Sequence, residues 1–156
     1  MNSGGSVDAD STPAPGLFFL DARLRASERL KSRRAIDAVF RGGATAKAYP
    51  LRLVYEEFPL AQAPPNRDPR RPDPSLQMGF VAPKRTFRRA HDRNHVKRRM
   101  REAFRLHKAP LAAWLRARGV GWRGMLLFTG RDLPSQDDVT RAWRKLLRRL
   151  DAEAFA

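Results

Sequence analysis

The spacing of apolar residues along the chain predicts short strands and amphipathic helices. Strands are expected where apolar and polar residues alternate or where a short apolar run lies between turn residues: residues 51–58, 76–82 and 122–129. On the first strand Leu51, Leu53 and Tyr55 share one face, because successive side chains of a strand point to opposite sides.

Helices are predicted from apolar residues three or four positions apart and from residues that favour helix ends. Ser32 can cap a first helix that a Gly-Gly pair ends, and Ser135 with an acid three residues later resembles a capping box for the last helix. Asp92 is the expected N-cap of a long helix that reaches about residue 108, and Pro110 is expected to start a separate helical segment.

A helix, strands, a helix, a strand and a helix, in this order, are typical of an α+β sandwich. Residues 21–156 are expected to form one domain. Residues 1–20 are rich in Ser, Gly and Pro and predict a disordered tail. Residues 59–75 contain six prolines between two apolar segments and predict a surface loop inside the domain.

The net charge of the chain indicates what kind of partner it binds. The chain has 32 Lys and Arg against 16 Asp and Glu, a formal net charge of +16, which favours a polyanion such as nucleic acid or an anionic membrane. No apolar run approaches the roughly 20 residues that span a bilayer, the N-terminal segment lacks the features of a secretory signal, and the chain has no cysteine. We therefore expect a cytoplasmic protein that neither spans nor binds a membrane.

Residues 91–105, HDRNHVKRRMREAFR, are compatible with two kinds of site. His91 and His95 lie four positions apart, as in the helix of zinc proteases. That helix needs a Glu and a third ligand, whereas here an Asp is in the Glu position, and an N-cap at Asp92 would leave His91 outside the helix. The many arginines nearby would also repel a divalent cation, so we expect no metal site and no catalytic side chain.

The same residues predict a helix with one packing face and one cationic face. At about 100° per residue, Val96, Met100 and Phe104 form an apolar stripe. The neighbouring arc, which extends to Lys108, contains cations and no acid, whereas a solvated helix face usually mixes both signs. Together with the basic segment before the helix, it gives the candidate RNA-binding residues: Lys84, Arg85, Arg88, Arg89, Arg93, Asn94, Lys97, Arg98, Arg101 and Arg105.

The run RNHVKRRMREAF at residues 93–104 closely resembles the signature helix of the bacterial ribonuclease P protein subunit. The segments RLKSRR, VFRGG and GFVAPKR also resemble parts of that family, and the resemblance extends over about residues 28–150. It implies a two-layer α+β sandwich of order α-β-β-β-α-β-α with a left-handed βαβ crossover, like a domain of a small-subunit ribosomal protein. His95 departs from the family, which usually has Arg there, and Ile36 stands where an aromatic residue is usual.

The resemblance also implies a function. In this family a catalytic RNA performs the chemistry and the protein assists it, and together they remove the 5′ leader of precursor tRNA, with Mg²⁺ held mainly by the RNA and the substrate. The chain would thus be one subunit of a ribonucleoprotein endoribonuclease. Its basic residues would dock on the catalytic RNA and reduce phosphate repulsion. A monomer in a one-to-one complex with the RNA is the simplest stoichiometry.

The resemblance further places the single-stranded leader in a cleft between the first helix and the sheet, lined by Ile36, Phe40, Leu53 and Tyr55. Stacking on aromatic rings tolerates most base sequences and contributes about 1–3 kcal/mol per base. These four residues are also suited to plain core packing. The alternative function for the whole chain is that of another basic RNA-binding protein, such as a ribosomal protein, which would leave precursor tRNA cleavage unchanged.

Overall fold

The computed structural model describes residues 28–62 and 75–155. Its elements are helix α2 (Arg33–Gly42), strands β2 (Ala44–Ala48) and β3 (Leu51–Pro59), the 3₁₀ helix η2 (Leu60–Gln62), strand β4 (Leu76–Val81), helix α3 (Ala90–Ala117), strand β5 (Val120–Phe128) and helix α4 (Gln136–Leu150). This confirms the α+β class and the order of helices and strands. The spacing of apolar residues did not place β2, because its sequence ATAKA buries only Ala48, with Ala46 partly buried beside the core.

The four strands form one mixed sheet of order β2-β3-β5-β4. β3 pairs antiparallel with both β2 and β5, whereas β4 and β5 are parallel and are joined through α3. The predicted βαβ unit is therefore β4-α3-β5, and its left-handed sense stays a prediction.

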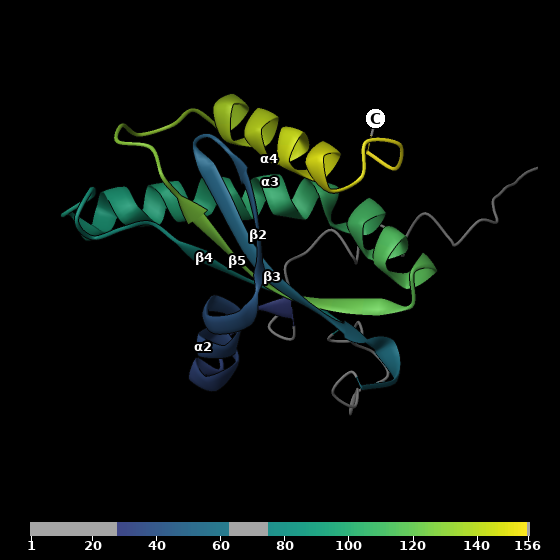
Figure 1. Ribbon diagram of the computed structural model, residues 1–156. Coiled ribbons are helices and arrows are strands. Elements are labelled where there is room, and N and C mark those ends of the chain that lie inside the picture. Colours follow the sequence, from purple (N-terminus) through teal and green to yellow (C-terminus); the bar gives the residue numbers. More distant parts are fainter. Residues whose placement is uncertain (1–27, 63–74, 156) are drawn as a thin grey trace, which may run out of the picture.

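Helices cover both faces of the sheet, with α3 and α4 on one side and the short α2 on the other (Figure 1). Under α3 and α4 lies the larger core, where Leu53, Phe104 and Trp143 have no exposed surface. A smaller cluster under α2 is formed by Leu30, Val39, Val54 and Met125. The alternation of β3 divides its side chains between these two cores.

Two helix starts agree with the sequence prediction. The Ser32 hydroxyl accepts a hydrogen bond from the backbone N–H of Ala35 at 3.3 Å, and α2 begins directly after it. At α4, the Ser135 hydroxyl accepts from the N–H of Asp138 at 3.0 Å, and the Asp138 carboxylate accepts from the Ser135 N–H at 3.4 Å. This reciprocal pair is the predicted capping box.

The prediction for α3 was wrong in two respects. Its N-cap is Arg89, with Asp92 in the first turn, where a negative charge suits the helix dipole. The helix also continues through Pro110 instead of ending there, and it bends along its length (Figure 1). Pro110 removes one helical hydrogen bond, but the helix persists because Leu111 and Leu115 beyond it pack into the core.

Candidate nucleic-acid interface

The basic connection at residues 83–89 links β4 to α3 as a compact turn. The backbone N–H groups of Thr86 and Phe87 both donate to the carbonyl of Pro83, at 3.2 and 3.0 Å. The Phe87 ring is buried against the ring of Phe128, with centroids 5.7 Å apart. This anchor keeps the turn in place, and its four predicted RNA-binding cations are all exposed: Lys84, Arg85, Arg88 and Arg89.

Arg93 joins this turn to the first turn of α3. One guanidinium nitrogen donates to the carbonyl oxygens of Phe87 and Arg88, both at 2.9 Å. A guanidinium has five N–H donors, so the other donors remain for a ligand. Arg93 therefore stabilises the basic surface as well as contributing charge to it.

The middle of the predicted surface carries cations close to one another. Asn94 and Arg98 are exposed, while Lys97 and Arg101 are partly buried. Burial, followed by the positive charges of Arg29 and Arg98, lowers the pKa of Arg101. An anion bound there would relieve this repulsion, and it would also meet Arg29, which the sequence pattern did not indicate.

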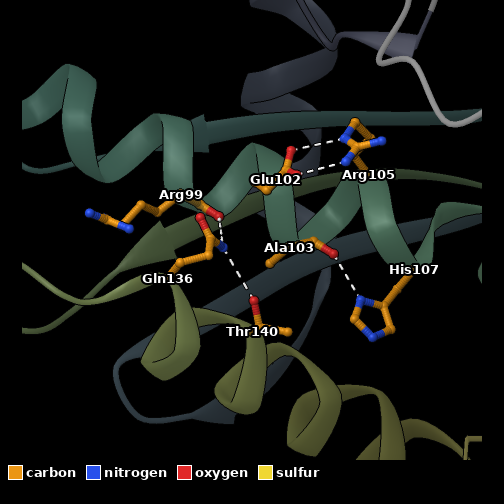
Figure 2. Close-up of polar contacts among 7 residues, drawn as sticks. All are labelled: Arg99, Glu102, Ala103, Arg105, His107, Gln136 and Thr140. Atoms are coloured by element: carbon orange, nitrogen blue, oxygen red, sulfur yellow. Dashed lines mark hydrogen bonds and ion pairs between the residues drawn. The ribbon is translucent and has the colours of Figure 1, made fainter.

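An acid beside the cationic arc pairs with the last of its predicted RNA-binding arginines. Arg105 donates from Nε and Nη2 to the two carboxylate oxygens of Glu102, at 2.8 and 2.7 Å (Figure 2). The hydrogen bond from Arg105 holds the pKa of Glu102 below its ordinary value. The arc itself holds no acid, but Glu102 lies beside its C-terminal end, and a helical side chain three residues away is within reach of Arg105.

Lys108 was also predicted on this arc, and the structure buries it. Its Nζ lies 3.0 Å from a carboxylate oxygen of Glu28, and both side chains are almost fully enclosed. A wheel of α3 alone could not show this, because Glu28 lies eighty residues earlier in the chain. The basic surface is therefore formed by residues 83–89 and by α3 up to about Arg101.

The two histidines of the zinc hypothesis both lie within α3, so the argument that His91 is outside the helix was wrong. The Nε2 of His95 accepts a hydrogen bond from Arg99 Nε at 2.8 Å. In the part of the chain that the structure describes, no three His, Asp or Glu side chains are grouped so that they could hold a metal ion. The geometry offers no support for a zinc centre there.

The four predicted leader-binding residues do not lie in one cleft. Leu53 is fully buried under α3 and α4, and Tyr55 on the same face stacks on Trp122 with centroids 4.5 Å apart. Ile36 and Phe40 are on α2, where Ile36 packs into the smaller core and the Phe40 ring is 45% exposed.

The sheet side chains beneath α2 include Val54, with Leu127 and Val81 at the margin of the same cluster. Each face of β3 carries a buried apolar side chain, Leu53 on one and Val54 on the other, so its sequence did not decide which face α2 would cover. Leu53 and Tyr55 were assigned to the wrong face, and the strand register moves any cleft beside α2 to Val54 and its neighbours.

Fold and surface together define a small α+β protein with a one-sided cationic face on one helix and the turn before it. The ribonuclease P family model matches residues 24–151. The ribonuclease P protein component of Porphyromonas gingivalis strain W83 is 38% identical over 130 residues, which cover 81% of this chain and 85% of that protein. A second strain of that species has a protein component that is 38% identical over 127 residues.

The fold agrees with solved structures. The RNase P protein of Staphylococcus aureus superposes with a TM-score of 0.59 at 14% identity, covering 83% of this chain and 98% of that one. A mutant of the S. aureus protein with defective mRNA degradation activity gives a TM-score of 0.56. The chain belongs to the ribonuclease P protein family, and this membership implies a part in tRNA processing. Over the described residues, no helix has the length and apolarity to cross a membrane.

Proposed function

We propose that this chain is the RNA-binding protein subunit of ribonuclease P and that it docks on the catalytic RNA through residues 83–89 and the first turns of α3. The observation that carries this proposal is the group of exposed cations on a braced turn and a rigid helix. Guanidinium groups match phosphate oxygens in a bidentate geometry. The N-cap Arg89 makes no side-chain capping bond, so the first backbone N–H groups of α3 would also be available to a bound anion.

The protein's contribution would be electrostatic and positional. Cations placed between phosphate groups reduce their repulsion and favour the folded RNA at lower salt or metal concentration. The described residues contain no group of His, Asp and Glu suited to a metal ion, so we assign no step to a protein-bound metal. The Mg²⁺ required for cleavage would be held by the RNA and the precursor tRNA.

The leader of precursor tRNA would contact the α2 side of the sheet. The exposed ring of Phe40 offers a stacking surface there, with Ile36 beside it. Single-stranded nucleic acids bind such rings with little sequence preference. Leu53 and Tyr55 are removed from this proposal because they lie on the other face.

The test is cleavage of a precursor tRNA by a bacterial ribonuclease P RNA at low Mg²⁺, with and without the protein. The protein should switch on cleavage at the mature 5′ end. Arg98→Ala should reduce this effect, weaken binding to the RNA and lower the salt dependence by about one unit, because one phosphate contact is lost.

Arg116→Ala is the matched control, since Arg116 is an exposed arginine near the other end of α3. It should leave binding and its salt dependence almost unchanged. Tight binding to the RNA without any gain in cleavage, tried with RNAs from several bacteria, would favour a ribosomal-type RNA-binding protein instead.

A further inference from the structure

A second cationic surface lies at one end of the sheet, where the β2–β3 turn and the β5–α4 loop come together (Figure 1). A cavity of about 390 Å³ is formed there, within the range of about 300–1,000 Å³ typical of small-ligand pockets. The residues that matter for its chemistry are Tyr49, Phe128, Arg131, Leu133, Arg141 and Lys145. None of these belongs to the surface on α3.

An aromatic ring stands at the rim of this cavity. Tyr49 is 77% exposed, although it is a large side chain next to an apolar floor. The turn that carries it is held to the end of β5, because the Thr129 N–H donates to the Pro50 carbonyl at 2.8 Å. Leu133 on the opposite loop is 49% exposed. The turn therefore presents the ring to solvent from a backbone that is held to the sheet.

The floor of the cavity is rigid. Phe128 is almost completely buried, and its ring packs against Phe87 of the basic connection. Gly130 lies so close to that ring that a Cβ atom there would be 2.8 Å from it. The cavity is thus joined directly to the base of the turn at residues 83–89, and a single RNA strand could reach both.

Cations complete the rim and continue along α4. Arg131, Lys145 and Arg148 are exposed and make no hydrogen bond or ion pair with the described residues. Arg141 differs, because it pairs with Asp137 and Asp138. Asp132 also lines the cavity, so the rim is mixed in sign but positive in balance.

We propose that this cavity binds one unstacked nucleotide of single-stranded RNA, with the base against Tyr49 and the neighbouring phosphates at Arg131 and Lys145. An exposed ring beside unpaired cations is the combination that single-stranded nucleic acids use for binding. A membrane surface would require bulkier apolar side chains around the cations. The inference rests on the proposed function in one respect, since that function supplies RNA as the partner.

The experiment uses the full chain and a short oligouridylate that carries a single 5-iodouridine. Ultraviolet crosslinking followed by peptide mapping should place a crosslink on Tyr49, and the double change Arg131→Ala with Lys145→Ala should lower its yield at least about fivefold. A duplex of the same sequence should not crosslink there, because its bases are stacked and unavailable.

The affinity for the single-stranded oligonucleotide gives a second readout. It is measured in the Arg98→Ala variant, so that the basic surface on α3 contributes less to binding. Tyr49→Ala should weaken single-strand binding about fivefold or more, and Tyr49→Phe should keep most of it, since the ring and not the hydroxyl stacks. Leu106→Ala, which removes another exposed apolar side chain on α3, should change nothing.

Crosslinks that avoid Tyr49, or an equal loss of single-strand and duplex binding in Tyr49→Ala, would overturn the inference. The outcome is separable from the proposed function. A chain that activates precursor tRNA cleavage but shows no crosslink at Tyr49 keeps its role in ribonuclease P and loses the second site.

Discussion

Arginines on one helix face differ in what they can offer to an RNA. Arg98 is exposed, and its charge acts on Arg101 nearby. Arg93 uses part of its guanidinium to brace the preceding turn. Arg105 is occupied by Glu102 through two hydrogen bonds. The number of cations in a motif therefore overstates the number of phosphate contacts.

Glu102→Gln should tighten binding to ribonuclease P RNA. The change removes a negative charge beside the basic surface and releases Arg105, which can then bind a phosphate and raise the salt dependence by about one unit. The stability cost should stay within about 0.5 kcal/mol, because exposed ion pairs within one helix contribute little. Binding titrations over a range of salt concentrations measure this, and an unchanged slope would show that Arg105 has no phosphate in reach.

The same pair gives a dependence on pH. The hydrogen bond from Arg105 lowers the pKa of Glu102 in the folded chain, so its small stabilisation is present above the ordinary pKa of glutamate and is lost as pH falls through the lowered value. Between neutral pH and the ordinary pKa of glutamate, the difference in free energy of unfolding between the native chain and Glu102→Gln should be constant. Urea unfolding at several pH values tests this, and a difference that fades already near neutral pH would contradict it.

Phe40→Ala should weaken binding of precursor tRNA to the assembled ribonucleoprotein by about fivefold or more, because a stacking surface for the leader is lost. Binding of mature tRNA, which has no leader, should be unchanged. Tyr55→Ala provides a contrast, since the half-buried Tyr55 stacks on Trp122 on the other face of the sheet and should affect folding stability instead. Equal losses for both RNAs would remove Phe40 from the leader site.

At the scale of elements, α3 begins differently from α2 and α4. α2 and α4 each start with a serine that caps backbone N–H groups, whereas α3 starts at Arg89 without a side-chain cap. At its other end, α3 is followed by Gly119, whose φ of 71° suits glycine. The uncapped start leaves backbone donors that could serve an anion, and it belongs to the helix on which we propose that the RNA binds.

Ser135→Ala should destabilise the protein by about 1 kcal/mol, the usual cost of losing an N-cap. The loss follows from the Ser135–Asp138 capping box, and it should leave RNA binding on α3 unchanged in folded protein. Thermal or urea unfolding measures the change. Ser32→Ala serves as a comparison, because Ser32 makes a single capping bond that is longer, at 3.3 Å. Its loss of stability should be smaller than that of Ser135→Ala. A larger loss in Ser32→Ala would mean that the capping box adds no stability beyond a single cap.

At the scale of the whole molecule, a buried ion pair connects distant parts of the chain. Glu28 precedes α2, Lys108 lies on α3, and the two meet across eighty residues of sequence. Buried charges are tolerated only when they are paired, because leaving one without its partner costs much more than an exposed pair contributes. This contact holds the segment that enters α2 against the helix that carries the basic surface.

Glu28→Gln should therefore destabilise the fold by about 3–5 kcal/mol, since it removes the acid from a buried ion pair. Replacing both residues with apolar ones of similar size, Glu28→Leu with Lys108→Met, should restore much of that loss. Unfolding free energies of the single and double variants form the test. A double variant that is as unstable as the single one would show that packing, and not charge, explains the effect.

Much of this organisation could be predicted from local patterns. Ser32 and Ser135 act on neighbouring N–H groups, so their caps followed from the sequence, and the apolar stripe of α3 placed Phe104 in the core. Contacts between distant segments were missed, as with Glu28 and Lys108. The prediction of Leu53 beside α2 was wrong because β3 has a buried apolar side chain on each face, Leu53 and Val54, and only the packing of α2 decides between the two faces.

The sheet has two edge strands, β2 and β4, and other segments of the same chain partly cover both edges. Next to β4, the Leu30 N–H donates to the Met78 carbonyl at 3.0 Å, and Arg29 forms a bridge with Met78. Next to β2, the Arg149 side chain donates to the Lys47 carbonyl. Uncovered edge strands pair with other chains, so a chain shortened to begin after Leu30 should be prone to self-assembly through β4. Sedimentation at several concentrations would test this. Self-association of the shortened chain would show that residues 29 and 30 protect the edge of β4, whereas a shortened chain that does not associate would show that charge repulsion is sufficient.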